Sequence, residues 1–476
     1  MSGGVWTEAD TKSPRTQPGV YSNIMAEAAQ ILEPGAGGTV FIVGTADWGP
    51  EDTVVSTFSE RPSSRGGSVQ ESFGKTGSLV KLSGQAFRGG AAEVKCLRVA
   101  AAAAAKATVS ITDGTSAALI LTAKYTGTRG NNLTVTVKNH PVPANGKLLE
   151  ISEGGVLIES HLITSNENDD IAPQINSSSE YVTAASTGTG GRALADVANA
   201  ALTGGNSGST LVAADYVAAQ GVAANEAFDV YVQGDDTTAA NQDAAGTWGT
   251  IQRDAGHRFV IVHGGVADES AADARTRAKS FDNRTNIYVH PGFTDEDGVE
   301  YSGQEAGARI AGMIAAKGFT RAITYSPVVG ATKTNVALSP TNVDLHLEAG
   351  VCTLVSDGGA VRVSKGINTL TTTGVGTNTL DTFSKIRTIR TLDAVENGLE
   401  RGARPYIGEV TNDADGRKSL EGALSAFLDE LVSGNAIQEG YTLQVEQGSA
   451  DQVFLTVGVT PLDSVEQVFT TIFVSA

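Results

Sequence analysis

The sequence predicts a multi-domain α/β protein that carries a small inserted β-sandwich. Its 476 residues correspond to about three domains of ordinary size. From about residue 210 onward, short β-branched runs alternate with helical patterns, which is typical of a parallel sheet covered by helices. Between residues 101 and 185, several short strand-like segments are separated by turn residues, which favours a sandwich.

The N-terminal part begins with a polar stretch, residues 1–18, that has no apolar period. We expect this stretch to be an extended arm. A weak alternation then predicts a short strand made of Val20, Tyr21, Ser22, Asn23, Ile24 and Met25. Thr39–Gly44 (TVFIVG) is a continuous apolar run bounded by glycine, so it is predicted to be a strand buried on both faces.

The inserted β unit starts after a shift in composition marked by six alanines, Ala100–Ala105. Its strand-like segments are ATVSIT, AALILTA, NLTVTVK, KLLEIS and VLIESHLI. The run GTRGNN (Gly127–Asn132) supplies turn residues between the second and third of them. We place this all-β unit at residues 101–185 and interpret the following STGTGGRA as a linker.

The α/β region has three buried strand patterns, at Phe228–Gln233, Arg258–Gly264 and Asn286–His290. Apolar residues at helical spacing follow in Ala271–Phe281 and Ala306–Lys317. The second helix is preceded by Ser302-Gly303-Gln304-Glu305, a capping-box pattern in which the hydroxyl and the carboxylate accept hydrogen bonds from the otherwise unpaired amides.

The last hundred residues change pattern again. Leu392, Val395 and Leu399 fall at helical steps, and a longer amphipathic helix is predicted through Leu420–Leu431. Val453–Val459 alternates like a half-buried strand, whereas Gln467–Val474 (QVFTTIFV) is apolar on both faces.

Composition and charge exclude several classes of protein. Lysine and arginine number 34 against 53 carboxylates, a net charge of −19, which argues against nucleic-acid binding and against a polybasic membrane-surface patch. The sequence shows no signal peptide, and no run reaches the roughly 20 apolar residues of a membrane span. We therefore expect a soluble protein made in a cytoplasm, with Cys96 and Cys352 as free buried thiols.

No pattern of catalytic or metal-binding residues is recognisable. The six histidines are scattered, no HExxH or P-loop occurs, and the acidic turns at Asp295–Gly298 and Asp413–Gly416 lack the glutamate that would complete a calcium loop. The residues that a triad could use, outside any nucleophile motif, are Asp229, His257, His263 and Ser280. We predict a protein that is not an enzyme and has no cofactor and no metal.

The C-terminal strand pattern allows two interpretations. A strand that is apolar on both faces must be covered on both, because at a sheet edge it would promote aggregation. It is either a central strand of its own domain or a strand donated to a neighbouring copy. The residues of this predicted intersubunit strand are Val468, Phe469, Thr470, Thr471, Ile472, Phe473 and Val474.

The chain resembles the contractile tail sheath proteins of myophages and related phage-tail-like particles, especially those of Gram-positive phages and defective prophages. The similarity extends over nearly the whole chain. The motifs that carry it are Pro18-Gly19-Val20-Tyr21, the GTADWGP turn after TVFIVG, YTGTRGNN, and the segments 347–372, 383–395, 406–420 and 457–474. A long Ala- and Gly-rich stretch around 186–225 departs from that pattern.

The resemblance implies a subtilisin-like α/β domain without a catalytic triad, an outward-facing inserted sandwich and a C-terminal α/β domain that faces a tail tube. The expected divisions are 1–25 (arm), 26–100 (first part of the core), 101–185 (sandwich), 186–357 (subtilisin-like domain) and 358–476 (C-terminal domain). The resemblance also implies that the terminal strands of neighbouring copies complete a sheet, with Val453–Val459 in the accepting part.

The function implied is that of a structural subunit of the virion tail. Such subunits polymerise as stacked, hexameric rings around the tail tube and contract to drive the tube through the host envelope. The implied partners are further copies of the chain, the tail tube protein, and baseplate and tail terminator proteins, with no direct nucleic-acid contact and no membrane insertion. Two alternatives stay open, a static surface or S-layer-like array and a degenerate α/β hydrolase.

Residues 381–418 are the candidate tube-facing segment, since they carry seven cations and seven carboxylates. This balance is locally less repulsive to an acidic tube than the rest of the chain. The candidate tube contacts are Lys385, Arg387 and Arg390, with a solvated or intersubunit face as the alternative.

Overall fold

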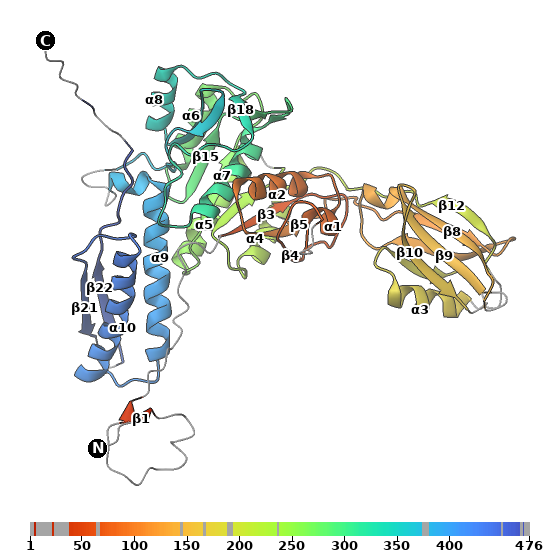
Figure 1. Ribbon diagram of the computed structural model, residues 1–476, viewed down its shortest axis with the longest axis horizontal. Helices are drawn as coiled ribbons and strands as arrows, with labels where there is room; N and C mark the ends of the chain where they lie inside the picture. Colours follow the sequence, from red (N-terminus) through yellow and green to blue (C-terminus); the bar gives the residue numbers. More distant parts are fainter. Residues whose placement is uncertain are drawn as a thin grey trace, which may run out of the picture.

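The architecture comes from a computed structural model that describes residues 4–5, 21–22, 38–62, 67–142, 146–164, 168–187, 194–235, 238–373, 380–448, 451–466 and 470. Figure 1 shows a central α/β domain, with a β-rich domain projecting from one side and a helix-rich C-terminal unit on the other. The mixed α/β, multi-domain class predicted from the sequence is confirmed.

The central domain is built on an eight-stranded sheet. Across the sheet, the strands are β20 (Ala360–Val363), β19 (Val351–Asp357), β15 (Asn286–His290), β14 (Val260–Gly264), β13 (Val230–Gln233), β3 (Thr39–Gly44), β5 (Glu93–Arg98) and β4 (Val54–Thr57). The six inner strands are parallel, and the two edge strands run antiparallel to their neighbours. The predicted parallel sheet and its strands at 39–44, 228–233, 258–264 and 286–290 are therefore confirmed, with shorter bounds for two of them.

Helices cover both faces of this sheet (Figure 1). The helices are α1 (Val69–Phe73), α2 (Ser78–Gly89), α4 (Ala213–Ala223), α5 (Ala239–Asp254), α6 (Ala271–Phe281), α7 (Gly303–Lys317) and α8 (Pro340–Glu348). The predicted capping box is present, because Ser302 accepts from the amide of Glu305 while the Glu305 carboxylate accepts from the amide of Ser302. A small sheet flanks the domain and contains β16 (Phe293–Asp295), β17 (Glu300–Tyr301) and β18 (Ala331–Thr334).

The projecting domain packs two antiparallel sheets around one apolar core. One sheet has the order β10 (Val156–Ile163), β9 (Gly146–Glu153), β8 (Leu133–His140), β12 (Val197–Ala201); the other has β11 (Val182–Ser186), β7 (Ala117–Ala123), β6 (Thr108–Thr112). The 3₁₀ turn η2 (Thr128–Asn132) and helix α3 (Asn168–Ser178) complete it. Because β12 pairs with β8, this sandwich extends past the predicted end at residue 185. The mostly exposed residues of β12 lack the alternation that marks a strand in sequence.

The junction between the sandwich and the central domain, which we call the neck, brings together the motifs GTADWGP and YTGTRGNN. Trp48 from GTADWGP is 3% exposed and packs in the sandwich core, where Arg129 from YTGTRGNN lies 5.3 Å from the centre of its ring. Arg98, only 1% exposed, donates to the carbonyl of Gly49 and to the carbonyl and hydroxyl of Thr126. Trp48 and Arg129, 81 positions apart in sequence, thus bring two motifs into one contact.

The C-terminal unit contains two long helices and a hairpin. They are α9 (Ile386–Ala403), α10 (Ala414–Ser433), β21 (Thr442–Gln447) and β22 (Val453–Gly458), with the 3₁₀ turns η3 (Asp381–Ser384) and η4 (Arg404–Tyr406) at the two ends of α9. Asp413 caps α10 by accepting from the amide of Gly416. The predicted helices near 391–401 and 420–431 are therefore confirmed and are longer than their apolar stripes indicate.

Near the N-terminus, β1 (Gly4–Val5) pairs in parallel with β2 (Tyr21–Ser22). Both cysteines are free and buried, as predicted. Burial raises the pKa of the Cys96 thiol to about 11 and that of Cys352 to about 12. Within the described ranges, no helix is long and apolar enough to cross a membrane.

Candidate assembly site in the C-terminal unit

The hairpin β21–β22 is a two-stranded sheet with one exposed face. One of its faces packs on α10 through Leu443 and Val457, whereas Phe454 on the other face is 59% exposed. Among the residues that the structure describes, neither strand pairs with a third one. In the described residues, this hairpin therefore has both the unpaired edges and the exposed apolar surface that an added strand would use.

The predicted intersubunit strands are only partly within the described residues. Tyr21 and Ser22 form β2, while Val20, Asn23, Ile24 and Met25 lie outside the described part of the chain. Of the C-terminal strand, Thr470 is exposed and outside any strand. The remaining members, outside the described residues, are Val468, Phe469, Thr471, Ile472, Phe473 and Val474. The strand predicted at Val453–Val459 is present as β22, and its role as acceptor stays a prediction.

The three candidate tube contacts are all engaged within the chain. Lys385 pairs with Asp463 and Glu466. Arg390, 9% exposed, donates to Asp229 at 3.0 Å. Arg387 is half-buried and donates to the carbonyl of Asn435 at 3.3 Å. The structure therefore gives each cation a partner inside its own copy, and their contact with a tube stays a prediction.

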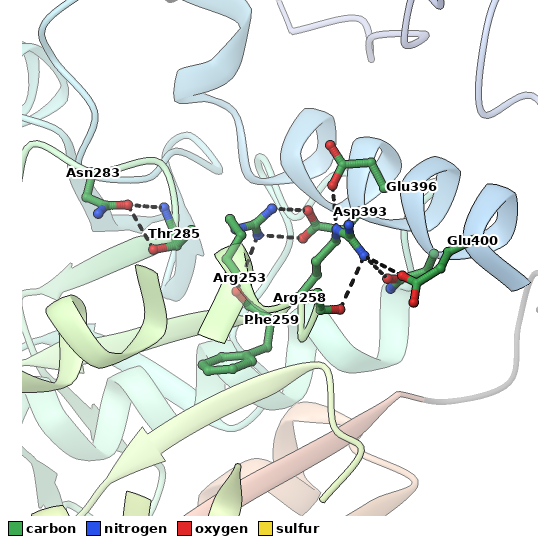
Figure 2. Close-up of polar contacts among 10 residues, drawn as sticks. Arg253, Arg258, Phe259, Asn283, Thr285, Asp393, Glu396 and Glu400 are labelled. Atoms are coloured by element: carbon green, nitrogen blue, oxygen red, sulfur yellow. Dashed lines mark hydrogen bonds and ion pairs between the residues drawn. The ribbon is translucent and has the colours of Figure 1, made fainter. Parts of the chain in front are cut away.

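Helix α9 is attached to the central domain by arginines that point at its carboxylates (Figure 2). Arg253, at the end of α5, binds Asp393 through both terminal nitrogens, with Nη2 2.9 Å from Oδ2. Arg258, in the loop before β14, contacts Glu396 and lies 3.2 Å from Glu400. With the Arg390–Asp229 pair, these contacts form what we call the α9 junction.

The electrostatics of the α9 junction vary with depth. Burial raises the pKa of Asp393, and the hydrogen bonds from Arg253 oppose that shift. At the surface, hydrogen bonds from Arg404 and Arg258 hold the pKa of Glu400 below its usual value. The buried pair therefore depends on mutual charge compensation, whereas the outer pair is partly solvated and weaker.

The residues considered for a triad are not assembled into one. They are Asp229, His257, His263 and Ser280. Asp229 accepts from Arg390, and His263 stacks on Phe281, where burial lowers its pKa to about 3. Over the described ranges, no hydrogen bond joins any two of the four, and no cluster of three or more potential metal ligands occurs. The acidic turn at Asp295 accepts hydrogen bonds from the amides of Asp297 and Val299 instead.

Comparison with known proteins identifies the family that shares this order of domains. Three domain families match in chain order: the phage tail sheath protein beta-sandwich domain at residues 100–207, the phage tail sheath protein central domain at 209–369, and the phage tail sheath C-terminal domain at 379–475. The chain belongs to the phage tail sheath protein family. The first match spans the sandwich including β12, and the third spans the C-terminal unit.

Individual relatives of this sheath protein agree with that membership. It is 26% identical over 151 residues to the tail sheath protein of Clostridium phage phiCD119, a stretch covering 32% of this chain and 42% of the relative. Its fold resembles the sheath tail protein of Desulfitobacterium hafniense, with a TM-score of 0.72, 20% identity, and coverage of 93% and 100% of the two chains. It also resembles the contracted helical sheath of the anti-feeding prophage, with a TM-score of 0.52, 12% identity, and coverage of 96% and 99%.

The sheath protein is therefore a structural component of a phage tail and not an enzyme. The predicted family is confirmed, and the hydrolase alternative is excluded. Sequence reasoning missed Arg253, Arg258 and Asp393 as residues that attach α9. No local signal marked Asp393, because it lies about 100° around the helix from Leu392 and off the predicted stripe of Leu392, Val395 and Leu399.

Proposed function

We propose that this sheath protein polymerises around a tail tube by exchanging its terminal strands and that the polymer contracts to drive the tube through the host envelope. The open β21–β22 hairpin is the observation that carries this proposal, because its edges are unpaired in the described residues and Phe454 is exposed. Added strands from neighbouring copies would cover that surface and give directional links. The similarity of the fold to a contracted sheath supports the contraction step.

The same proposal covers the roles of the individual domains, the symmetry of the rings and the partners of the assembly. The parallel sheet, covered on both faces, supports the subtilisin-like character proposed for residues 186–357, with residues 26–100 as the first part of the core. The sandwich would face outward, the C-terminal unit that begins with η3 and α9 would face the tube, and residues 1–25 would be the exchanged arm. The predicted boundary at 357/358 is too early, because β20 (Ala360–Val363) pairs with β19 in the central sheet. Rings would be hexameric, with the tube, baseplate and tail terminator proteins as partners. Subunits would assemble in the host cytoplasm and then form part of the virion.

Two truncations test the exchange of strands. Purified chains lacking residues 1–25 or 467–476 should stay soluble monomers, whereas the full chain forms tubes visible by negative-stain microscopy. Leu157→Ser, which alters an exposed residue of the sandwich, should polymerise like the unaltered chain. Ordered tubes from both truncations would contradict strand exchange.

The diameter of the tubes distinguishes a sheath from a static array. A contractile sheath should give two tubular forms of different diameter, because its subunits rearrange as rigid bodies between two states. A static surface array should give one packing under all conditions. A single form in extended and triggered particles would contradict contraction.

A further inference from the structure

The chain that leaves β22 is held at two successive places. The first is a backbone contact with the end of α10: the amide of Leu462 donates to Ala436 at 3.0 Å, and the amide of Gln438 donates to Thr460 at 2.8 Å. An antiparallel bridge between Ile437 and Pro461 lies between them. Residues 460–462 are thereby fixed against the C-terminal unit.

The second place is a cluster of charged side chains around Glu466. This carboxylate is 14% exposed and accepts from the hydroxyl of Thr324 at 3.0 Å and from Lys385 at 3.1 Å. Lys365 lies 4.0 Å away, and Lys385 also binds Asp463. Glu466 thus joins the departing chain to the central domain, through Thr324 and Lys365, and to the start of α9, through Lys385.

The charges in this cluster stabilise one another. Burial acts to lower the pKa of Lys385, but its hydrogen bonds to Asp463 and Glu466 raise it. Burial likewise acts to raise the pKa of Asp463, and the hydrogen bond from Lys385 lowers it. Side-chain exposures of 17% for Lys385 and 14% for Glu466 make this contact less screened by solvent than a surface pair.

The geometry points to Lys385 and Glu466 as positioning residues that fix where, and in which direction, the C-terminal segment leaves each copy. This inference rests on the proposed exchange of strands. Without the cluster, the last hydrogen bond in the described chain that ties this segment to the C-terminal unit is that of Leu462, and the four residues 463–466 can span up to about 14 Å. Holding Glu466 removes that freedom before the strand meets its acceptor, and such preorganisation lowers the entropic cost of association. Lys385 then holds the C-terminal segment of its own copy and does not contact the tube.

The experiment uses the full chain with Glu466→Gln, Lys385→Met and both changes together. Glutamine keeps an oxygen that can accept from Thr324 but loses the charge. The matched controls are Glu421→Gln and Lys333→Met, which alter exposed residues elsewhere. Two quantities are measured: amide hydrogen exchange of residues 460–466 in the monomer, and the protein concentration at which tubes form.

Each single variant should speed exchange at residues 463–466 and raise the concentration for tube formation about three- to tenfold. The double variant should be no worse than the more severe single one, because both remove the same contact. Controls should match the unaltered chain. Two results would overturn the inference. One is amide hydrogen exchange at residues 463–466 that does not change in the variants. The other is faster hydrogen exchange there with no change in the protein concentration at which tubes form. Failure of the unaltered chain to form tubes would contradict the proposed function instead. Amide hydrogen exchange in the monomer would still test the contact between Lys385 and Glu466.

Discussion

The neck uses a buried arginine, whereas Arg253 and Arg258 of the α9 junction are half-buried, and these arginines have different acceptors. At the neck, Arg98 binds mainly the carbonyl and hydroxyl oxygens of Gly49 and Thr126, with Glu51 at 3.6 Å. At the α9 junction, Arg253 and Arg258 bind carboxylates. Carbonyl acceptors do not titrate, whereas carboxylates do and are sensitive to salt. The difference predicts that the contacts of Arg98 depend less on pH and salt than the arginine–carboxylate pairs that attach α9.

The largest effect should come from breaking the apolar part of the neck. Trp48→Ala removes a large side chain from the sandwich core and should lower the free energy of unfolding of the sandwich by about 4 kcal/mol. The measurement is denaturant unfolding followed by hydrogen exchange of β6, β7 and β8. Val156→Ala, at a 67% exposed position, is the control and should change little. A loss below about 1 kcal/mol would mean that Trp48 does not belong to the sandwich core.

The next effect should come from breaking the buried pair of the α9 junction. Arg253→Met leaves Asp393 buried without its partner and should destabilise the attachment of α9 by about 3 kcal/mol. Hydrogen exchange of α9 measures it. Arg404→Met, which alters an arginine with a 70% exposed side chain, is the matched control. Adding Asp393→Asn to Arg253→Met should restore part of the loss, because no charge then stays unpaired. No recovery would argue against charge compensation as the cause.

The smallest effect should be the dependence of the α9 junction on acid. The pKa of Glu400 is lower in the folded chain than its ordinary value of 4.5, so its contribution to stability is present above that value and is lost as the pH falls through the folded pKa. Because Glu400 is 45% exposed, the contribution should be about 0.5 kcal/mol or less. Glu400→Gln should remove this part of the acid sensitivity of α9 and leave exchange at the neck unchanged. An equal response of the neck to acid would contradict the contrast between the junctions.

The elements of the fold were largely predictable, because their signals are local. The run TVFIVG, the Ser302–Glu305 capping box and the apolar steps of α9 and α10 each depend on residues within a few positions of one another. Strand β12 was not predictable, since its exposed residues carry no alternation and it joins the sandwich only through pairing with β8.

The candidate site was predictable in part. The strand β22 at Val453–Gly458 was predicted from its alternation, but the partners of Lys385 were not. Lys385 is 78 and 81 residues from Asp463 and Glu466, and Arg253 is 140 residues from Asp393. Charge at such separations has no period from which a pairing can be inferred.

The sequence by itself determined which segments form strands and helices, the absence of a recognisable catalytic motif, and a pattern of motifs shared with tail sheath proteins. The tertiary structure decided which arginine meets which acceptor, how the neck differs from the α9 junction, and that Lys385 pairs with Asp463 and Glu466 near the C-terminus of its own copy. The physical reason is that secondary structure follows from the spacing of neighbouring residues, whereas a buried charge is defined by what the folded chain brings beside it.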